Sequence, residues 1–144
     1  MGTSAFRRKP WYLSARPRNG KRSSFEAALV TDMELRGLDF EYEPSDAHLG
    51  YMLEYIPDFR LPNGILVEAK GFFDSTDRTK MLRVKMANPT ADIRFIFMAN
   101  NKINPKSKSR YSDWCLKHGF KYHIGRSIPE DWWHEQGVTN DDIP

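Results

Sequence analysis

Three residues near the middle of the chain, Asp58, Glu68 and Lys70, have the side chains needed for metal-assisted hydrolysis of a phosphodiester. Carboxylate oxygens are hard ligands that suit Mg²⁺ or Mn²⁺, and a metal ion held by them binds phosphate oxygens and lowers the pKa of a bound water. The lysine ammonium can orient or activate the attacking water and offset negative charge in the transition state. These residue types therefore predict a hydrolytic site, provided that the fold brings them together.

A predicted β-hairpin brings these residues together. The runs 57–61 and 65–70 flank Asn63-Gly64, a dipeptide typical of tight hairpin turns. Residues two apart on a strand share a face, so the carboxylate of the second run and its ammonium project together, while the residues beside them face the core. The turn also folds Asp58 back toward Glu68. The alternative is an ordinary ion pair on a solvated hairpin face, which contributes little to stability.

Glu26 is a fourth candidate, at the start of a predicted helix. Ser23 and Glu26 have the spacing of a capping box, and Gly37 is the predicted stop of the helix. From this position Glu26 could reach the same site and hold a second metal ion, although the capping role alone also accounts for a glutamate there. The apolar residues expected on one face of this helix are Phe25, Ala28, Leu29 and Met33.

The rest of the pattern alternates between strands and helices. Pro89 and Gly119 mark the ends of two helical stretches, and the apolar run near residue 95 is typical of a buried strand. This order predicts an α/β fold with a mixed central β-sheet flanked by helices. The expected further segments are strands at 38–42, 51–56, 93–98 and 120–124, and helices at 76–88 and 111–118.

Charge is distributed unevenly along the chain. The first 25 residues hold seven basic side chains and no acid, which leaves 15 basic and 19 acidic side chains, a net charge of −4, on the other 119 residues. We therefore expect a flexible basic arm at 1–22 and one globular domain at 23–144. A basic arm suits a polyanion, because each neutralised phosphate releases counterions; the alternative is a solubilising tail.

Composition narrows the class of protein further. Hydrophobic residues make up 40% of the chain, which is enough to close a core, and the apolar runs are too short to span a membrane. The lone Cys115 and the lack of a charged-then-apolar leader predict a reducing cytosol. We therefore expect a globular cytoplasmic protein with no membrane partner.

The hairpin segment also carries a family resemblance. Pro57-Asp58 followed by Glu68-Ala69-Lys70 matches the PD-(D/E)xK nuclease signature, and the stretch 55–71 as a whole resembles the bacteriophage endonuclease I family, whose members resolve Holliday junctions. The likeness covers most of residues 23–133. Its other segments are 24–26, 40–43, 92–94, 114–119 and 128–132.

The resemblance implies a restriction-endonuclease-like fold and an intertwined homodimer that exchanges N-terminal strands. It implies catalytic roles for Glu26, Asp58, Glu68 and Lys70, and metal coordination by Asp58, Glu68, Ala69 and Glu26. The implied cofactor is Mg²⁺, with Mn²⁺ as a substitute and two ions per active site, and the implied location is the cytosol of a bacterial host. The arm residues that would bind DNA are Arg7, Arg8, Lys9, Arg16, Arg18, Lys21 and Arg22.

The predicted function is a structure-selective DNA endonuclease that resolves four-way (Holliday) and other branched DNA junctions. One alternative is a general PD-(D/E)xK nuclease that cuts duplex or single-stranded DNA, because the motif does not encode substrate shape. Another is a non-catalytic junction-binding protein, against which the intact acids and lysine argue. Basic residues elsewhere could contact phosphates or simply form a solvated surface; they are Arg78, Lys80, Arg83 and Lys85 in one helix and Lys102, Lys106, Lys108 and Arg110 in a loop.

Overall fold

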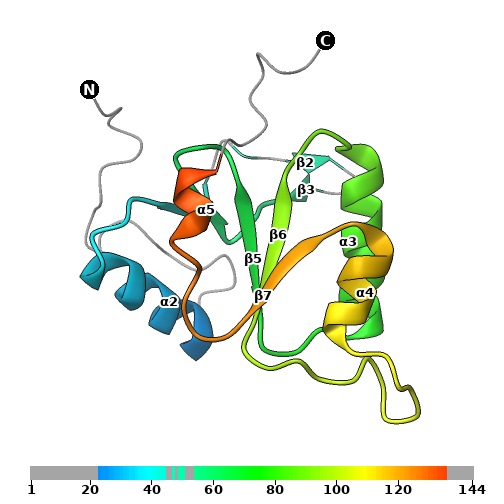
Figure 1. Ribbon diagram of the computed structural model, residues 1–144. Coiled ribbons are helices and arrows are strands. Elements are labelled where there is room, and N and C mark those ends of the chain that lie inside the picture. The colour runs from blue at the N-terminus through cyan, green and yellow to red at the C-terminus, as the bar shows by residue number, and fades with distance from the viewer. Residues whose placement is uncertain (1–22, 45–46, 48, 51–53, 136–144) are drawn as a thin grey trace.

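The computed structural model describes residues 23–44, 47, 49–50 and 54–135, and shows a β-sheet between two layers of helices (Figure 1). Helices α2 (Ser24–Leu35) and α5 (Asp131–His134) contribute to the hydrophobic core on one face of the sheet. Helices α3 (Ser75–Ala87) and α4 (Tyr111–His118) contribute to the core on the other face. The expected α/β class with a mixed central sheet is confirmed, whereas the restriction-endonuclease-like fold and the intertwined homodimer remain predictions.

The main sheet has five strands in the order β1-β4-β5-β6-β7. Strands β1, β4 and β5 pair antiparallel, and β5, β6 and β7 pair parallel. Each parallel neighbour requires a crossover, and helices α3 and α4 provide these connections. The strands are β1 Glu41–Tyr42, β4 Phe59–Arg60, β5 Leu66–Lys70, β6 Ile93–Phe97 and β7 Lys121–Ile124, with a separate two-stranded ribbon of β2 Leu49–Gly50 and β3 Glu54–Tyr55.

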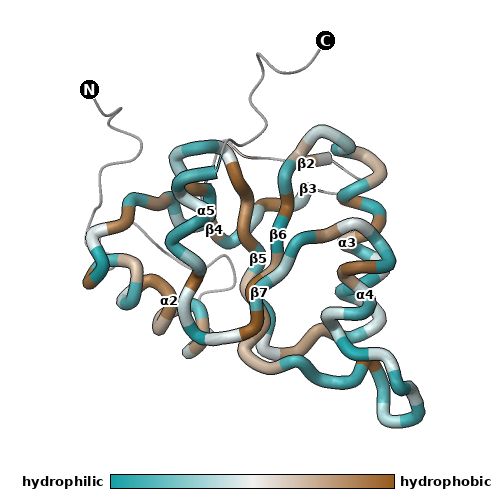
Figure 2. Tube along the Cα trace, viewed as in Figure 1, coloured by the Kyte–Doolittle hydropathy of each residue, from teal (hydrophilic) through white to brown (hydrophobic). Residues whose placement is uncertain are grey.

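Strand β5 contributes to both hydrophobic cores because its side chains alternate between the two faces of the sheet. Val67 packs in the core beneath α2 and α5, and Leu66 packs in the core beneath α3 and α4. Figure 2 shows this strand as largely hydrophobic, while the loop between β6 and α4 is mostly hydrophilic. A central strand held from both sides is a firm support for the polar side chains at its end.

Most of the expected elements are present, with three corrections. Helix α2 buries Val30 in place of Ala28, which is exposed. The strand expected at 38–42 is paired only at Glu41–Tyr42, and α5 was not expected as a helix. In the run 51–56 the described strand is β3, and residues 51–53 lie outside the described part of the chain. The proposed arm, 1–22, also lies outside it, and no described helix is long and apolar enough to cross a membrane.

Candidate active site

The hairpin between β4 and β5 aligns the first two candidate residues. Gly64 has φ 90°, which explains the glycine in this turn, and its N–H donates to the Leu61 carbonyl at 2.9 Å. Because Phe59 is the Cα partner of Val67, the preceding residue, Asp58, lies across from Glu68. The predicted approach of these two carboxylates is confirmed.

Both carboxylates are buried and held by hydrogen bonds. Asp58 is 5% exposed and Glu68 is 4% exposed. The Ala69 backbone N–H donates to Asp58 Oδ2 at 2.9 Å, and the Tyr55 hydroxyl donates to Glu68 Oε1 at 2.6 Å. An ordinary solvated hairpin face would leave such side chains in water, so that alternative is wrong for this pair. Tyr55 was not anticipated, because its contact depends on how the chain enters β4.

Lys70 projects on the same side as Glu68, as the strand period predicted. Its Nζ lies 3.6 Å from Glu68 Oε2 and 3.7 Å from Asp77 Oδ2, in the first turn of α3. Burial lowers the pKa of Lys70, but the nearby carboxylates of Glu68, Asp77 and Asp58 outweigh that effect and raise it. The side chain is therefore a firmly protonated cation between the two elements.

Glu26 caps α2, and its carboxylate also lies beside that of Asp58, as the sequence allowed; its role as a metal ligand stays a prediction. Its backbone N–H donates to Ser23 Oγ at 3.0 Å, which caps α2, and its Oε2 accepts from the same hydroxyl at 2.7 Å. Its other carboxylate oxygen accepts from the Tyr42 hydroxyl at 2.9 Å. This second contact turns Glu26 toward the end of β1, beside Asp58.

Glu43 completes the acidic cluster, and the sequence argument missed it. Carboxylate oxygens of Glu26, Glu43 and Asp58 all lie within 4.8 Å of one another. The Glu43 N–H donates to the Asp58 carbonyl at 2.8 Å, one step beyond the β1–β4 pair of Tyr42 with Phe59. Its φ of 45° is in the left-handed region, a strain of the kind found at functional sites. Only knowledge of the β1–β4 register would have identified this residue.

This crowding of like charges fits a divalent cation. Burial raises the pKa of Asp58 well above its usual range, and the charges of Glu68 and Glu26 raise it further, against the Ala69 hydrogen bond and Lys70. A cation bound among these oxygens would offset the repulsion, and oxygen-rich sets of this kind suit Mg²⁺ or Mn²⁺. The Ala69 N–H is used by Asp58, and the predicted role of Ala69 as a metal ligand is untested.

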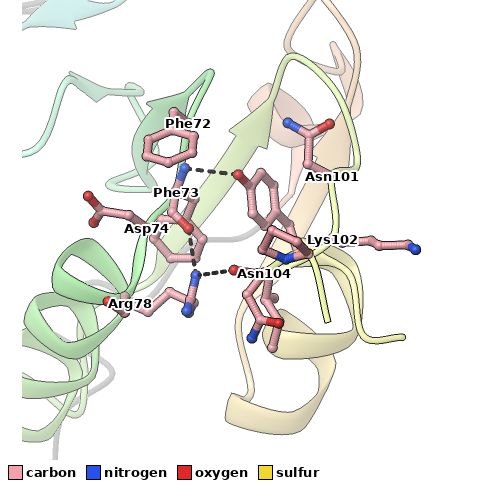
Figure 3. Close-up of a pocket in the computed structure, with 11 residues that line it drawn as sticks. Phe72, Phe73, Asp74, Arg78, Asn101, Lys102 and Asn104 are labelled. Atoms are coloured by element: carbon pink, nitrogen blue, oxygen red, sulfur yellow. Dashed lines mark hydrogen bonds between the residues drawn. The ribbon is translucent and has the colours of Figure 1, made fainter. Parts of the chain in front are cut away.

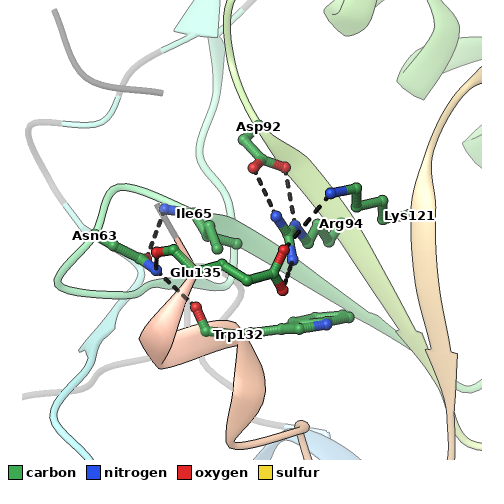
Figure 4. A network of polar contacts seen from close by, with 7 residues as sticks. All are labelled: Asn63, Ile65, Asp92, Arg94, Lys121, Trp132 and Glu135. Carbon is green, nitrogen blue, oxygen red and sulfur yellow. Dashed lines mark hydrogen bonds and ion pairs between the residues drawn. The ribbon is translucent and has the colours of Figure 1, made fainter. Parts of the chain in front are cut away.

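A polar network anchors the turn of the hairpin at the end away from the acids (Figure 4). Arg94, 1% exposed, donates to both carboxylate oxygens of Asp92 and to Glu135 Oε2, and its guanidinium lies 5.2 Å from the centre of the Trp132 ring. Asn63 Nδ2 donates to the carbonyls of Trp132 and Glu135. The C-terminal helix is therefore tied to the turn that sets the register of the site.

The cations outside the site have mixed roles. Arg78 donates to two carbonyls, and Lys80 and Lys85 lie over the rings of Tyr55 and Phe120, so these three side chains make structural contacts. The other candidate side chains are exposed and could contact phosphates; they are Arg83, Lys102, Lys106, Lys108 and Arg110, of which Arg110 also donates to the Asn100 carbonyl. The seven arm residues predicted to bind DNA, Arg7, Arg8, Lys9, Arg16, Arg18, Lys21 and Arg22, lie outside the described residues.

Comparison with known proteins gives consistent matches. A family model described as phage endonuclease I matches residues 11–142. The chain is 38% identical over 120 residues to Endonuclease I of Escherichia phage T7, covering 77% of this chain and 76% of that protein. It is also 38% identical over 110 residues to Endodeoxyribonuclease 1 of Enterobacteria phage T3, covering 70% of this chain and 69% of that protein.

Proposed function

The chain belongs to the phage endonuclease I family, and on this premise we propose that it is a structure-selective DNA endonuclease that resolves four-way and other branched DNA junctions by metal-dependent phosphodiester hydrolysis. The names of its relatives support a DNA-cleaving enzyme. The observation that carries the chemistry is the approach of two buried carboxylates and one lysine at the ends of β4 and β5.

The proposed cofactor is Mg²⁺, with Mn²⁺ as a substitute and two ions per site. Asp58, Glu68 and the backbone of Ala69 would hold one ion, and Asp58 and Glu26 would hold the other, with Glu43 as an additional carboxylate close enough to take part. Bound there, the ions would supply an activated water and stabilise charge on the phosphate. Asp58 is buried between the two groups of ligands, so its carboxylate would be within reach of both ions.

The protein's own groups would position the reaction. The protonated Lys70 would donate to a phosphate oxygen or to the attacking water, and its contacts with Glu68 and Asp77 restrict where its ammonium can lie. Tyr55 would fix the orientation of the Glu68 carboxylate through its hydrogen bond. In this arrangement lysine would act as a cation and hydrogen-bond donor held between Glu68 and Asp77.

We further propose that two copies form a strand-exchanged homodimer, so that two active sites cut opposing strands of one junction. The basic arm, 1–22, would clamp the DNA through phosphate contacts, and the enzyme would act in the cytosol of a bacterial host. Deleting the arm should weaken junction binding and reduce its dependence on salt, since fewer counterions are released. Equal salt slopes for the full and the truncated chain would leave the arm without this role.

The test of the proposed function is cleavage of a labelled four-way DNA junction in Mg²⁺, beside the matching duplex and single strand at equal protein concentration. Paired cuts near the branch with little duplex cleavage are the expected result. Glu68→Ala should bind the junction but not cut it, which controls for contaminating nucleases. Equal cutting of all three substrates would favour a general nuclease, and tight binding without cleavage would favour a non-catalytic junction-binding protein.

A further inference from the structure

A pocket of about 690 Å³ lies beside the candidate active site, between the β5–α3 and β6–α4 connections (Figure 3). Ligand sites in open α/β sheets commonly lie outside the carboxyl ends of parallel strands, which is where these connections begin. The volume lies within the roughly 300–1,000 Å³ of typical ligand pockets. One wall is formed by residues 72–75 and Arg78, and the other by residues 101–105 and Tyr111.

The two walls are tied together by hydrogen bonds, so the pocket is preformed. Arg78 Nη1 donates to the Phe73 carbonyl at 2.8 Å and to the Ile103 carbonyl at 3.2 Å, one on each wall. The Phe73 N–H donates to the Tyr111 hydroxyl at 3.1 Å, and the two rings meet edge to face. A ligand would therefore enter a pocket whose walls are already in place.

The rim of the pocket combines an exposed aromatic ring with polar and basic groups. Phe72 is 71% exposed, although a phenyl ring is costly to leave in water. In Figure 3, Phe72 and Asn101 lie toward the same end of the pocket on opposite walls, and Lys102 extends outward. Residues 99–110 include four basic side chains and no acid; Lys102 lines the pocket, and the others follow it in the same connection. The one acid of the lining, Asp74, accepts the Asp77 N–H as the cap of α3.

The pocket is also within reach of the reaction. Phe72 follows Lys70 by two residues, which span at most about 7 Å of chain. Asp77, which contacts Lys70, is on the same first turn of α3 that Asp74 caps at the pocket. The reach from Lys70 to Phe72 corresponds to about two nucleotide steps, since one step rises about 3.4 Å along a DNA strand.

We propose that this pocket binds one nucleotide of the DNA strand next to the phosphate that is cut, with its base stacked on Phe72 and its backbone facing the cations of residues 99–110. This inference rests on the proposed DNA-cleaving function and adds to it a subsite that grips the strand beside the reaction. An exposed ring suits any base, because every base has a face that stacks. The subsite would therefore position the strand without reading its sequence.

The test measures DNA binding in EDTA, where cleavage does not interfere, together with the emission of 2-aminopurine placed at each position flanking the cut. Phe72→Ala should weaken binding about 5- to 150-fold, the range for loss of one stacked base. It should also restore emission that the wild type quenches at one position. Phe72→Trp should retain tight binding. Leu116→Ala is the matched control, because Leu116 is 69% exposed on α4 and does not line the pocket.

Two results would overturn the subsite. The first is equal binding and quenching by Phe72→Ala and Leu116→Ala. The second is a mass of DNA-free Phe72→Ala in sedimentation that differs from that of the wild type. This result would show that a second copy of the chain, rather than DNA, covers Phe72. Failure of junction selectivity is a separate outcome, in which the wild type cuts duplex and junction equally. In that case Phe72→Ala should still weaken binding to duplex DNA, and unchanged duplex binding would refute the subsite.

Discussion

Asp58→Asn should stabilise the metal-free protein while abolishing cleavage. The side chain is 5% exposed, and its oxygens lie near those of Glu26 and Glu43, with all three ligand atoms within 4.8 Å of one another. An asparagine of the same shape removes the charge but keeps an oxygen that can accept the Ala69 N–H. The substitution therefore relieves repulsion without opening a cavity.

The size of the effect follows from Coulomb's law. Two unit charges 4.8 Å apart repel by about 3–4 kcal/mol at an effective dielectric constant of 20. The nearby Lys70 offsets part of this cost in the wild type. We therefore expect a net gain of about 1–2 kcal/mol, as found for relief of strained active sites, and a rise in Tm of roughly 2–8 °C for a chain of this length.

The gain should depend on pH in a defined direction. The pKa of Asp58 in the folded state is raised above 3.8, so between 3.8 and the raised value the folded state binds more protons than the unfolded state. Wild-type stability from this group therefore falls as pH rises through that window and is constant above it. The advantage of Asp58→Asn should be large above the window and small at its acidic end.

The assay is thermal unfolding of both proteins in EDTA across the pH range, repeated with Mg²⁺. Added Mg²⁺ should stabilise the wild type more than the variant, because ligand binding to the folded state adds stability. Asp39→Asn, an exposed change elsewhere, should stay within about 0.5 kcal/mol of wild type. If Asp58→Asn is less stable than wild type in EDTA at neutral pH, the reasoning about charge crowding fails.

Three further changes test separate parts of the site. Lys70→Met should lower the rate of single-turnover cleavage about 10²- to 10³-fold, the range for loss of one preorganised donor, while DNA affinity in EDTA stays nearly unchanged. A wild-type cleavage rate would show that Lys70 has no role in the reaction. Glu43→Gln should weaken Mn²⁺ binding measured by calorimetry about 10- to 100-fold, the range for loss of a group that supports a metal site; an unchanged isotherm would exclude Glu43 from the metal site. Arg94→Met should lower the free energy of unfolding in urea by about 2–4 kcal/mol, somewhat less than for a fully buried ion pair, because Asp92 and Glu135 are partly exposed. An unfolding midpoint equal to that of the wild type would show that the network is dispensable.

The central part of the site could be predicted because its information is local. Asn63-Gly64 fixes the hairpin, and the two-residue period of a strand then places Glu68 and Lys70 on one side. All of this lies within residues 58–70. The helices α3 and α4 were likewise predictable to within a residue or two, since caps and stops such as Gly119 mark their ends.

The rest of the site depends on contacts between distant segments. Glu43 reaches Asp58 through β1, a strand of only two residues, which is too short to show a period. Tyr55 and Asp77 enter from β3 and α3, and no local pattern specifies that either will meet β5. Arg94 is buried in a strand, where an arginine seldom lies. One of its partners, Glu135, comes from a distant part of the chain, so no local pattern predicts this burial.

The Arg94 network also explains how a destabilising group of acids keeps its geometry. The repulsion around Asp58 could be relieved if β4 slipped by one residue against β5, but a one-residue slip turns every side chain of the strand to the opposite face. Here such a slip would remove Phe59 from its core. The hydrogen bonds of Asn63 to the C-terminal helix fix the turn against that movement. Charge repulsion at the acidic end of the hairpin is thus resisted at its opposite end. We therefore predict that weakening the turn would also weaken metal binding at the proposed site.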